Sequence, residues 1–173
     1  MAFTLYAATI PSYLQILSSV SRLVTKAEDH CREAGLEPDA LIQARLADDM
    51  LPFAYQIKST VVHSIGAIDG VRKGVFSPDT TTPPATFEGL RERVAGAITV
   101  LEAITSDEME GFIGRDMRFE FGSNAMEFDA EQFLLSFSQP NFYFHATTAY
   151  DILRMKGVQI GKRDFNGRVR KRA

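Results

Sequence analysis

The chain has 173 residues, of which 45% are hydrophobic and 24% are charged, and its formal net charge at pH 7 is −3. This length is sufficient for one domain whose core needs no metal or disulfide. The small net charge gives no electrostatic reason to expect a nucleic-acid partner. Cys31 is the only cysteine, so an internal disulfide is excluded and a reducing, cytoplasmic location is expected.

The apolar N-terminal stretch, residues 1–20, differs from a signal peptide in two ways. The first positive charge is Arg22, and Pro11 and several polar residues interrupt the apolar pattern. The chain also contains no run of about 18 uninterrupted apolar residues, the length that a transmembrane helix needs. We therefore expect no membrane partner.

Residues 3–34 have apolar side chains at helical spacing, so the first predicted element is an amphipathic helix of this length. Pro11 should kink this helix or mark a late start, and Gly35 should end it. The apolar stripe consists of Phe3, Tyr6, Ile10, Tyr13, Leu14, Leu17, Val20, Val24 and Cys31.

A second helix is predicted from Asp39, a suitable N-cap residue, to Gly70 or Gly74. Pro52 lies inside the pattern and predicts a kink just before it. The apolar arc consists of Ile42, Leu46, Met50, Phe53, Ile57, Val61 and Ile68.

The remaining elements follow a loop rich in proline and threonine at residues 77–86. Thr86 is expected to cap a third helix that extends to about Ile104. Alternating residues around a Gly-Ser-Asn turn then predict a β-hairpin at residues 115–129. A last helical region follows and should stop at Lys156–Gly157.

These elements predict an all-α protein, a four-helix bundle with a small β-hairpin before its last helix. Residues 1–165 are expected to form a single domain. The basic tail, residues 166–173, is expected to be disordered.

His145 is the strongest candidate for a functional residue. On a helical projection it lies near the centre of the apolar face of the last helix, where Asn141 flanks it and Phe142 is a neighbour. A buried imidazole needs hydrogen-bond partners, so a polar group on another helix should face it. A metal ligand, a general acid–base and a satisfied core histidine all fit this position.

The second helix offers the partners. Asp49, Gln56 and His63 recur at seven-residue spacing and form a polar stripe beside the apolar arc, with His63 about 120° from the centre of that arc. The stripe either faces solvent or lines a cleft against the last helix, where Asp49 or His63 would face His145.

The motifs of several site classes do not occur in the sequence. There is no glycine-rich phosphate loop, zinc-finger spacing, HExxH or GxSxG sequence. Cys31 lies on the apolar stripe of the first helix, where an inert thiol is expected.

The segments QARLADDMLPFAYQI (residues 43–57) and PNFYFHATTAYDILRMKGVQIGKRDF (residues 140–165), with the order of elements, resemble the DinB/YfiT-like superfamily. Within it, the chain is most similar to an uncharacterised family known as a domain of unknown function. This resemblance implies an up-down-down-up bundle. It also implies a metal held by one histidine of the second helix and two of the last, spaced as HxxxH.

The resemblance places His63 and His145 at the first two of these ligand positions, and the third falls on Ala149. Two imidazoles, even together with Asp49, match the three-histidine pattern poorly. We therefore expect no bound cofactor, although a divalent metal held by His63, His145 and Asp49 remains an alternative.

Three functions fit the sequence. The first is an enzyme without metal, or with a degraded metal site, that uses His145 as general acid or base on a small molecule. Its reaction class would be that of an isomerase, cyclase or transferase. The second is a non-catalytic bundle that binds a small molecule or acts as a scaffold. The third is a hydrolase or transferase that depends on a divalent metal.

In the first reading the catalytic residues are His145, Asp49 and His63, in a pocket between the second and last helices. The side chains expected to bind substrate are Gln56, Phe53, Asn141, Phe142 and Tyr13, since a small-molecule site needs apolar walls and a few polar groups. Aromatic residues on the outer faces of the bundle, and the superfamily resemblance, also predict a homodimer.

Overall fold

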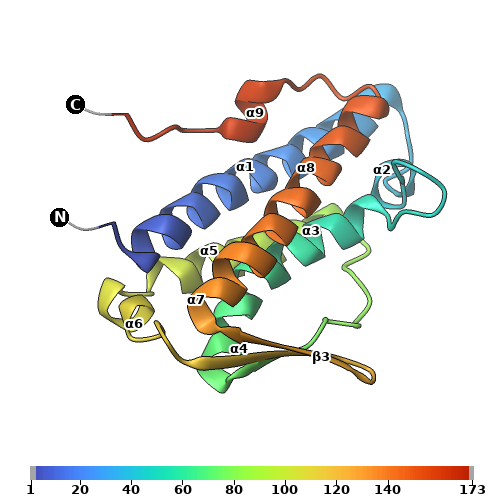
Figure 1. Cartoon of the computed structure of the whole chain (residues 1–173). Helices are drawn as coiled ribbons and strands as arrows, with labels where there is room; N and C mark the ends of the chain where they lie inside the picture. Colours follow the sequence, from blue (N-terminus) through green and yellow to red (C-terminus); the bar gives the residue numbers. More distant parts are fainter. Residues whose placement is uncertain (1–2, 172–173) are drawn as a thin grey trace.

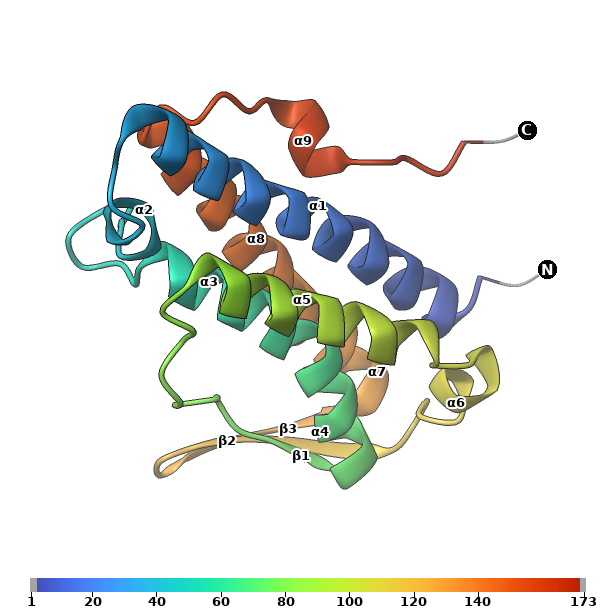
Figure 2. The ribbon, with the colours of Figure 1, turned by 180° about the vertical axis from the view of Figure 1, so that it is seen from behind.

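The computed structural model describes residues 3–171. Its four longest α-helices are α1 (Leu5–Ala34), α3 (Phe53–Val61), α5 (Phe87–Glu102) and α8 (Gln139–Met155), and they pack against one another. Figure 1 shows α8 crossing in front of α3, and Figure 2 shows α1 and α5 side by side on the opposite face. The core between these helices is apolar and includes Leu17, Ile57, Leu90 and Phe142, all inaccessible to solvent.

The C-terminal end of α1 follows the prediction from the sequence, and its N-terminal end lies two residues after the predicted start at Phe3. The Thr4 side chain accepts a hydrogen bond from the Ala7 amide at 3.1 Å, which caps the helix N-terminus. Gly35 ends the helix in the left-handed conformation, with φ of 64°, as expected for a C-cap glycine. The helix continues through Pro11 and does not start after it.

The predicted second helix is interrupted. In the first part of the predicted helix, only α2 (Asp39–Ile42) is helical, and its N-cap residue is Pro38, not Asp39. Residues 43–52 form a loop. Pro52 is extended, with ψ of 170°, and the Phe53 amide donates to the Ala44 carbonyl at 2.8 Å. Pro52 therefore precedes a new helix, α3, and the kink predicted there is a break.

The chain continues from α3 into a π-helical turn, η1 (Val62–Gly66), and then into α4 (Ala67–Lys73). Gly74, with φ of 74°, ends this run. Thr86 caps α5, as predicted, by accepting a hydrogen bond from the Gly89 amide at 3.1 Å.

A three-stranded sheet lies below the helices in Figure 2. The predicted hairpin is present as β2 (Asp116–Phe121) and β3 (Asn124–Asp129), joined by a two-residue turn at Gly122–Ser123. Gly122 has φ of 59°, a conformation that favours glycine. The strand β1 (Val75–Phe76), which the sequence did not predict, pairs in parallel with β2. The fold is therefore mainly helical with a small sheet, not all-α with an isolated hairpin.

The remaining elements are short helices: α6 (Ser106–Glu110), α7 (Ala130–Gln132), the π-helical η2 (Phe133–Ser138) and α9 (Lys162–Asn166). The segments α7, η2 and α8 follow one another without a gap, and α8 ends just before the predicted stop at Lys156–Gly157. No helix among residues 3–171 has the length and hydropathy needed to cross a membrane.

The C-terminal segment, from α9 into the basic tail, contacts α1. Lys26 of α1 pairs with Asp164 of α9 at 2.7 Å. Further on, the Arg170 guanidinium donates to the Pro11 carbonyl at 2.6 Å. Within the described part of the tail, residues 166–171, the Asn166 carbonyl accepts from Gln15 of α1 at 2.8 Å, and residues 172–173 lie outside the described part. The disorder expected for the tail stays a prediction.

Candidate functional site

His145 is half-buried on α8, and its Nδ1 lies 2.7 Å from Oε1 of Gln56 on α3. Gln56 is 2% exposed, and its Nε2 donates to the Leu51 carbonyl at 2.8 Å. The amide oxygen of Gln56 therefore faces the imidazole and can only accept a hydrogen bond. His145 must carry its proton on Nδ1, which leaves the lone pair of Nε2 free.

His63, in η1, is fixed in the same tautomer by a different partner. Its Nδ1 lies 3.2 Å from Oγ of Ser138, and this hydroxyl donates to the backbone carbonyl of His63 at 3.1 Å. A serine hydroxyl has one proton to donate, so the Ser138 oxygen accepts from Nδ1–H of the imidazole. The Nε2 of His63 is therefore also unprotonated.

The two imidazoles, called the histidine pair below, lie next to each other. Their ring centroids are 5.7 Å apart, and the ring planes are inclined by 15°. Within residues 3–171, neither Nε2 has a hydrogen-bond partner. Burial lowers the pKa of His63 to about 4, with a smaller effect from the nearby His145, and burial lowers the pKa of His145 to about 4. Both rings are neutral at pH 7.

Both π-helical segments contribute to this arrangement. His63 belongs to η1, and Ser138, its partner, is the last residue of η2. The i→i+5 bonding of a π-turn widens the helix by one residue, and such turns are frequent at functional sites. Here they bring the His63 ring and the Ser138 hydroxyl, which are 75 residues apart in the sequence, into a reciprocal pair of hydrogen bonds.

The histidine pair lines a cavity of about 220 Å³, which has room for about seven water molecules at ~30 Å³ each. Aromatic side chains supply most of its walls, and a few polar groups complete it. The lining residues are Tyr55, Ser59, Val62, His63, Phe76, Pro78, Asp79, Phe119, Phe137, Asn141 and His145.

A glycine in α4 allows the Phe76 side chain to come close to the histidine pair. A Cβ added at Gly70 would lie 2.9 Å from Cβ of Phe76, too close for any side chain there unless Phe76 moved. With glycine at this position, the Phe76 ring reaches His63, at a centroid distance of 5.6 Å. The sheet residue Phe76 thus becomes part of the cavity.

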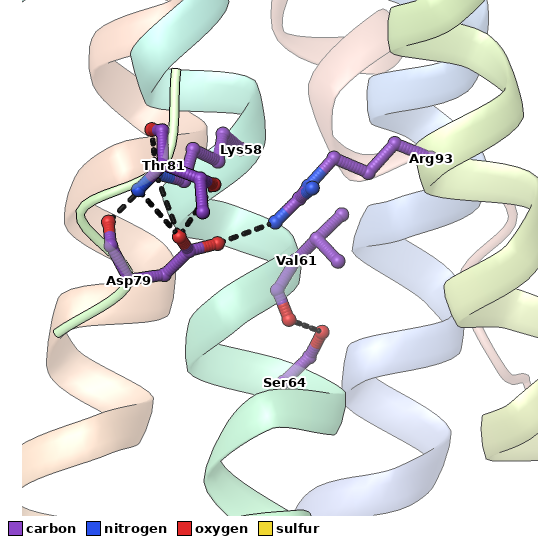
Figure 3. A network of polar contacts seen from close by, with 6 residues as sticks. All are labelled: Lys58, Val61, Ser64, Asp79, Thr81 and Arg93. Carbon is purple, nitrogen blue, oxygen red and sulfur yellow. Dashed lines mark hydrogen bonds and ion pairs between the residues drawn. The ribbon is translucent and has the colours of Figure 1, made fainter. Parts of the chain in front are cut away.

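Asp79 connects the cavity to a buried lysine. Lys58 of α3 is 1% exposed, and its Nζ lies 3.1 Å from the Asp79 carboxylate, while it also donates to the backbone carbonyls of Asp79 and Thr81. Arg93 of α5 reaches the other carboxylate oxygen at 2.8 Å. Figure 3 shows Asp79 between the two cations, and we call these three residues the ion network.

The ion network holds its carboxylate charged. Burial alone would raise the pKa of Asp79, but hydrogen bonds from Thr81 and the Lys58 ammonium outweigh it and lower the pKa to about 2. Because both cations contact Asp79, its charge is compensated within the protein. The network fastens the loop after β1 to α3 and α5.

The predicted site residues divide into two groups. His63, His145 and Asn141 line the same cavity, and Gln56 lies behind it as the partner of His145. Asp49 lies elsewhere: it is exposed in the loop before α3, because that part of the chain is not helical. The prediction that Asp49 faces His145 is therefore wrong.

The three aromatic residues predicted to bind substrate do not line the cavity. Phe53, Phe142 and Tyr13 are each inaccessible to solvent in the core. The rings of Tyr13 and Phe142 pack edge to face at 4.7 Å. Burial raises the pKa of the Tyr13 hydroxyl, which has no hydrogen-bond partner among the described residues.

Sequence reasoning missed Lys58, Asp79, Ser138 and Tyr55. The burial of Lys58 could have been predicted from its spacing. It is four residues after Ala54 and three before Val61, and both of these are buried on α3. A lysine at this position of an apolar arc needs a buried anionic partner. Asp79 gave no such signal, since it lies in a loop rich in proline and threonine.

The donor set does not match the three-histidine metal site that the resemblance implies. The third position is Ala149, which is buried one turn after His145 on α8. Among residues 3–171 no group of three or more histidine, cysteine, aspartate or glutamate side chains is arranged to hold a metal ion. Two neutral imidazoles alone do not fit a tightly held divalent cation.

Comparison with known proteins gives a family for the sequence and a solved structure with a similar fold. The sequence profile of a domain of unknown function, DUF1993, matches residues 5–166. A crystal structure of a DinB family member protein from Shewanella denitrificans superposes with a TM-score of 0.81 at 24% identity, covering 98% of this chain and 95% of that one. A search of the curated proteins found no match. The expected membership of an uncharacterised family is thereby confirmed, and the fold is similar to that of the DinB family member.

Proposed function

We propose that this chain, which belongs to the DUF1993 family, is an enzyme that transfers a proton on a small organic molecule bound in the cavity, with His145 as general base and acid. The observation that carries the proposal is the histidine pair. Each imidazole is fixed as the Nδ1–H tautomer by a separate partner, and both unprotonated Nε2 atoms belong to side chains that line one small cavity.

In the proposed step, Nε2 of His145 accepts a proton from an O–H, N–H, S–H or activated C–H group of the substrate. The Nδ1–H bond to Gln56 keeps the ring oriented, and the Gln56 oxygen stabilises the imidazolium that forms. The proton then returns to another atom of the substrate, directly or by way of His63. This sequence fits an isomerase, a cyclase or a transferase.

A second candidate, a non-catalytic small-molecule binder, is favoured by one observation. Burial lowers the pKa of both imidazoles to about 4, below the value near neutrality that best suits a general base. Rings of such low basicity act well as hydrogen-bond acceptors. The metal-dependent hydrolase or transferase is the least supported reading, because Ala149 replaces the third ligand.

The test is a search for proton transfer, in which small carbon acids and small esters are incubated with the protein in D₂O. Deuterium incorporation and hydrolysis are followed by NMR. We expect turnover of at least one compound by the wild type and a loss of about 10²- to 10⁴-fold in His145→Phe, the usual contribution of a general acid–base. Equal activity of the variant would refute the role of His145, and inactivity of the wild type on all compounds would favour the binding protein.

Two further features of the chain are proposals. The mutual packing of α1, α3, α5 and α8 supports the up-down-down-up four-helix bundle that the resemblance implies. The exposed apolar side chain of Phe144, 55% accessible on α8, supports a homodimer. Light scattering at micromolar concentration should then give about twice the monomer mass of 19.2 kDa.

A further inference from the structure

We infer that the cavity selects a small uncharged molecule with two adjacent hydrogen-bond donors, such as a diol, and rejects anions; this inference rests on the proposed function for the location of the ligand. It follows from the polar groups of the lining that only accept hydrogen bonds; the hydroxyls of Tyr55 and Ser59, which also line the cavity, can accept or donate and so fit either kind of ligand. The histidine pair contributes two Nε2 atoms, and neutral imidazole nitrogens without a proton only accept hydrogen bonds.

A third acceptor lies one turn before His145 on α8. The Nδ2 group of Asn141 donates one of its two protons to the Phe137 carbonyl at 2.7 Å, and the amide oxygen of the same side chain can accept a hydrogen bond from a ligand. Together with the histidine pair, this makes three acceptors from residues that line one small cavity. A ligand that offered only acceptors would leave all three without partners, which is costly where water is displaced.

The charges around the cavity argue against both anions and cations. None of its described lining residues is a lysine or an arginine, so an anion would meet no cation in the lining, and the lining carboxylate of Asp79 offers it no hydrogen-bond donor. The same carboxylate gives little attraction to a cation, because Lys58 and Arg93 already contact its two oxygens. Desolvating a charged ligand would therefore be poorly compensated. An uncharged ligand fits best.

The walls set the shape of the ligand. Phe119 packs between two other phenyl rings, with centroid distances of 4.9 Å to Phe137 and 6.3 Å to Phe76. The nearly parallel imidazoles stand 5.7 Å apart beside them. A flat apolar body would contact the phenyl rings while two neighbouring donors reach the two Nε2 atoms.

The test is an NMR titration of the protein with three small ligands of nearly equal size, carried out at pH 7.0 in oxygen-free buffer. Catechol has two adjacent donors, 2-fluorophenol has one and 1,2-difluorobenzene has none. We expect each lost donor to weaken binding about 3- to 10-fold, the usual effect of one neutral hydrogen bond. Benzoate, an anion of similar size, should bind more weakly than catechol.

Two variants locate the effect. In His63→Phe and in His145→Phe, one acceptor is lost, so the advantage of catechol over 2-fluorophenol should shrink to within about twofold. The matched control is His30→Phe, because His30 lies on α1 outside the cavity and the advantage should be unchanged. If either variant fails to fold, the affinities of the three probes for the wild-type protein still test the inference.

The inference is overturned if benzoate or 1,2-difluorobenzene binds as tightly as catechol, or if the catechol advantage survives in both cavity variants. These failures are distinct from a failure of the proposed function. Turnover of an anionic substrate that is lost in His145→Phe would keep the enzyme and refute the ligand class. The expected affinity series without any turnover would keep the ligand class and refute the enzyme.

Discussion

Two groups of polar side chains border the same cavity, and they are stabilised in opposite ways. In the ion network, Lys58 and Arg93 both contact Asp79, and the Lys58 ammonium has three oxygen acceptors. In the histidine pair, each ring is neutral and has a single partner, on Nδ1. The first group has its charges paired within the protein, with only the Nε of Arg93 lacking a partner among the described residues, whereas the second keeps one free nitrogen on each ring.

The difference separates a structural role from a functional one. A buried charge is stable only when its partners are in place, so the ion network fixes the loop that carries Asp79. A half-buried neutral imidazole tolerates a free lone pair as long as water or a ligand can reach it. The ion network therefore holds one wall of the cavity, and the histidine pair is available to whatever enters.

Breaking the ion network should have the largest effect. In Lys58→Met the ammonium that contacts the Asp79 carboxylate and two backbone carbonyls is lost, and this ammonium belongs to a side chain that is 1% exposed. We expect the free energy of unfolding to fall by about 3–5 kcal/mol, as for other broken buried ion pairs. Urea denaturation measures this change.

Lys26→Met is the matched control for that experiment. Lys26 also pairs with an aspartate, Asp164, at 2.7 Å, but its side chain is 44% exposed. Exposed pairs contribute at most about 1 kcal/mol. If Lys58→Met costs no more than Lys26→Met, the ion network does not stabilise the loop.

The pH dependence of stability tests the histidine pair. The pKa of each ring is about 4 in the folded chain and 6.5 when unperturbed, so the unfolded chain binds more protons between these values. Stability is therefore fully present above pH 6.5 and is lost as pH falls toward 4. One pKa unit corresponds to about 1.4 kcal/mol, and since both rings keep some solvent contact, we expect a total loss on the order of 3 kcal/mol.

The measurement is urea denaturation at several values of pH between 7.5 and 4. The double variant His63→Phe/His145→Phe should lose most of this dependence, because it removes both imidazoles whose pKa burial lowers. The Asp79 carboxylate, with a pKa of about 2, contributes little in this window. A double variant with the same slope as the wild type would show that other groups cause it.

The comparison also shows where sequence reasoning succeeds. The predicted end of α1 at Gly35 and the predicted start of α5 at Thr86 are right because these caps are local signals. Placement of His145 succeeds for a similar reason. It follows the π-turn, so its position relative to Phe142 and Ala149 depends only on the regular geometry of α8.

The errors come from tertiary structure. Pro52 produces a break and not a kink because the Phe53 amide bonds to Ala44, a contact that no local pattern encodes. That break places Asp49 in solvent. His63 was projected about 120° from the apolar arc on a continuous α-helix, but it lies in a π-turn that changes the phase by one residue. Its contact with Ser138 was therefore invisible to helical periodicity.

Single substitutions in the histidine pair should have smaller effects, and unequal ones. His145→Phe leaves the Oε1 atom of the buried Gln56 without a donor, so we expect a loss of about 1–3 kcal/mol in unfolding free energy. His63→Phe leaves Ser138, which still donates to the carbonyl of residue 63, so its cost should stay below about 1 kcal/mol.

A second substitution checks that explanation. Gln56→Leu in the His145→Phe background replaces both partners by apolar groups, which is often nearly neutral, and should recover part of the loss. Denaturation of the three variants at pH 7.5 gives the values. If the double variant is less stable than His145→Phe, the cost has another origin, such as a poor fit of the phenyl ring.

The smallest expected effect is that of divalent metal. His63 and His145 supply two imidazole nitrogens, position 149 is alanine and Asp49 lies in a distant loop, so two protein ligands remain. Zinc sites that hold their metal tightly use three or four protein ligands. We therefore expect dialysed protein to carry no stoichiometric zinc or nickel by elemental analysis, and added zinc to shift the thermal midpoint by no more than it does in His63→Phe. About one metal per chain, lost in that variant, would instead make the histidine pair a metal site and refute proton transfer by a free imidazole.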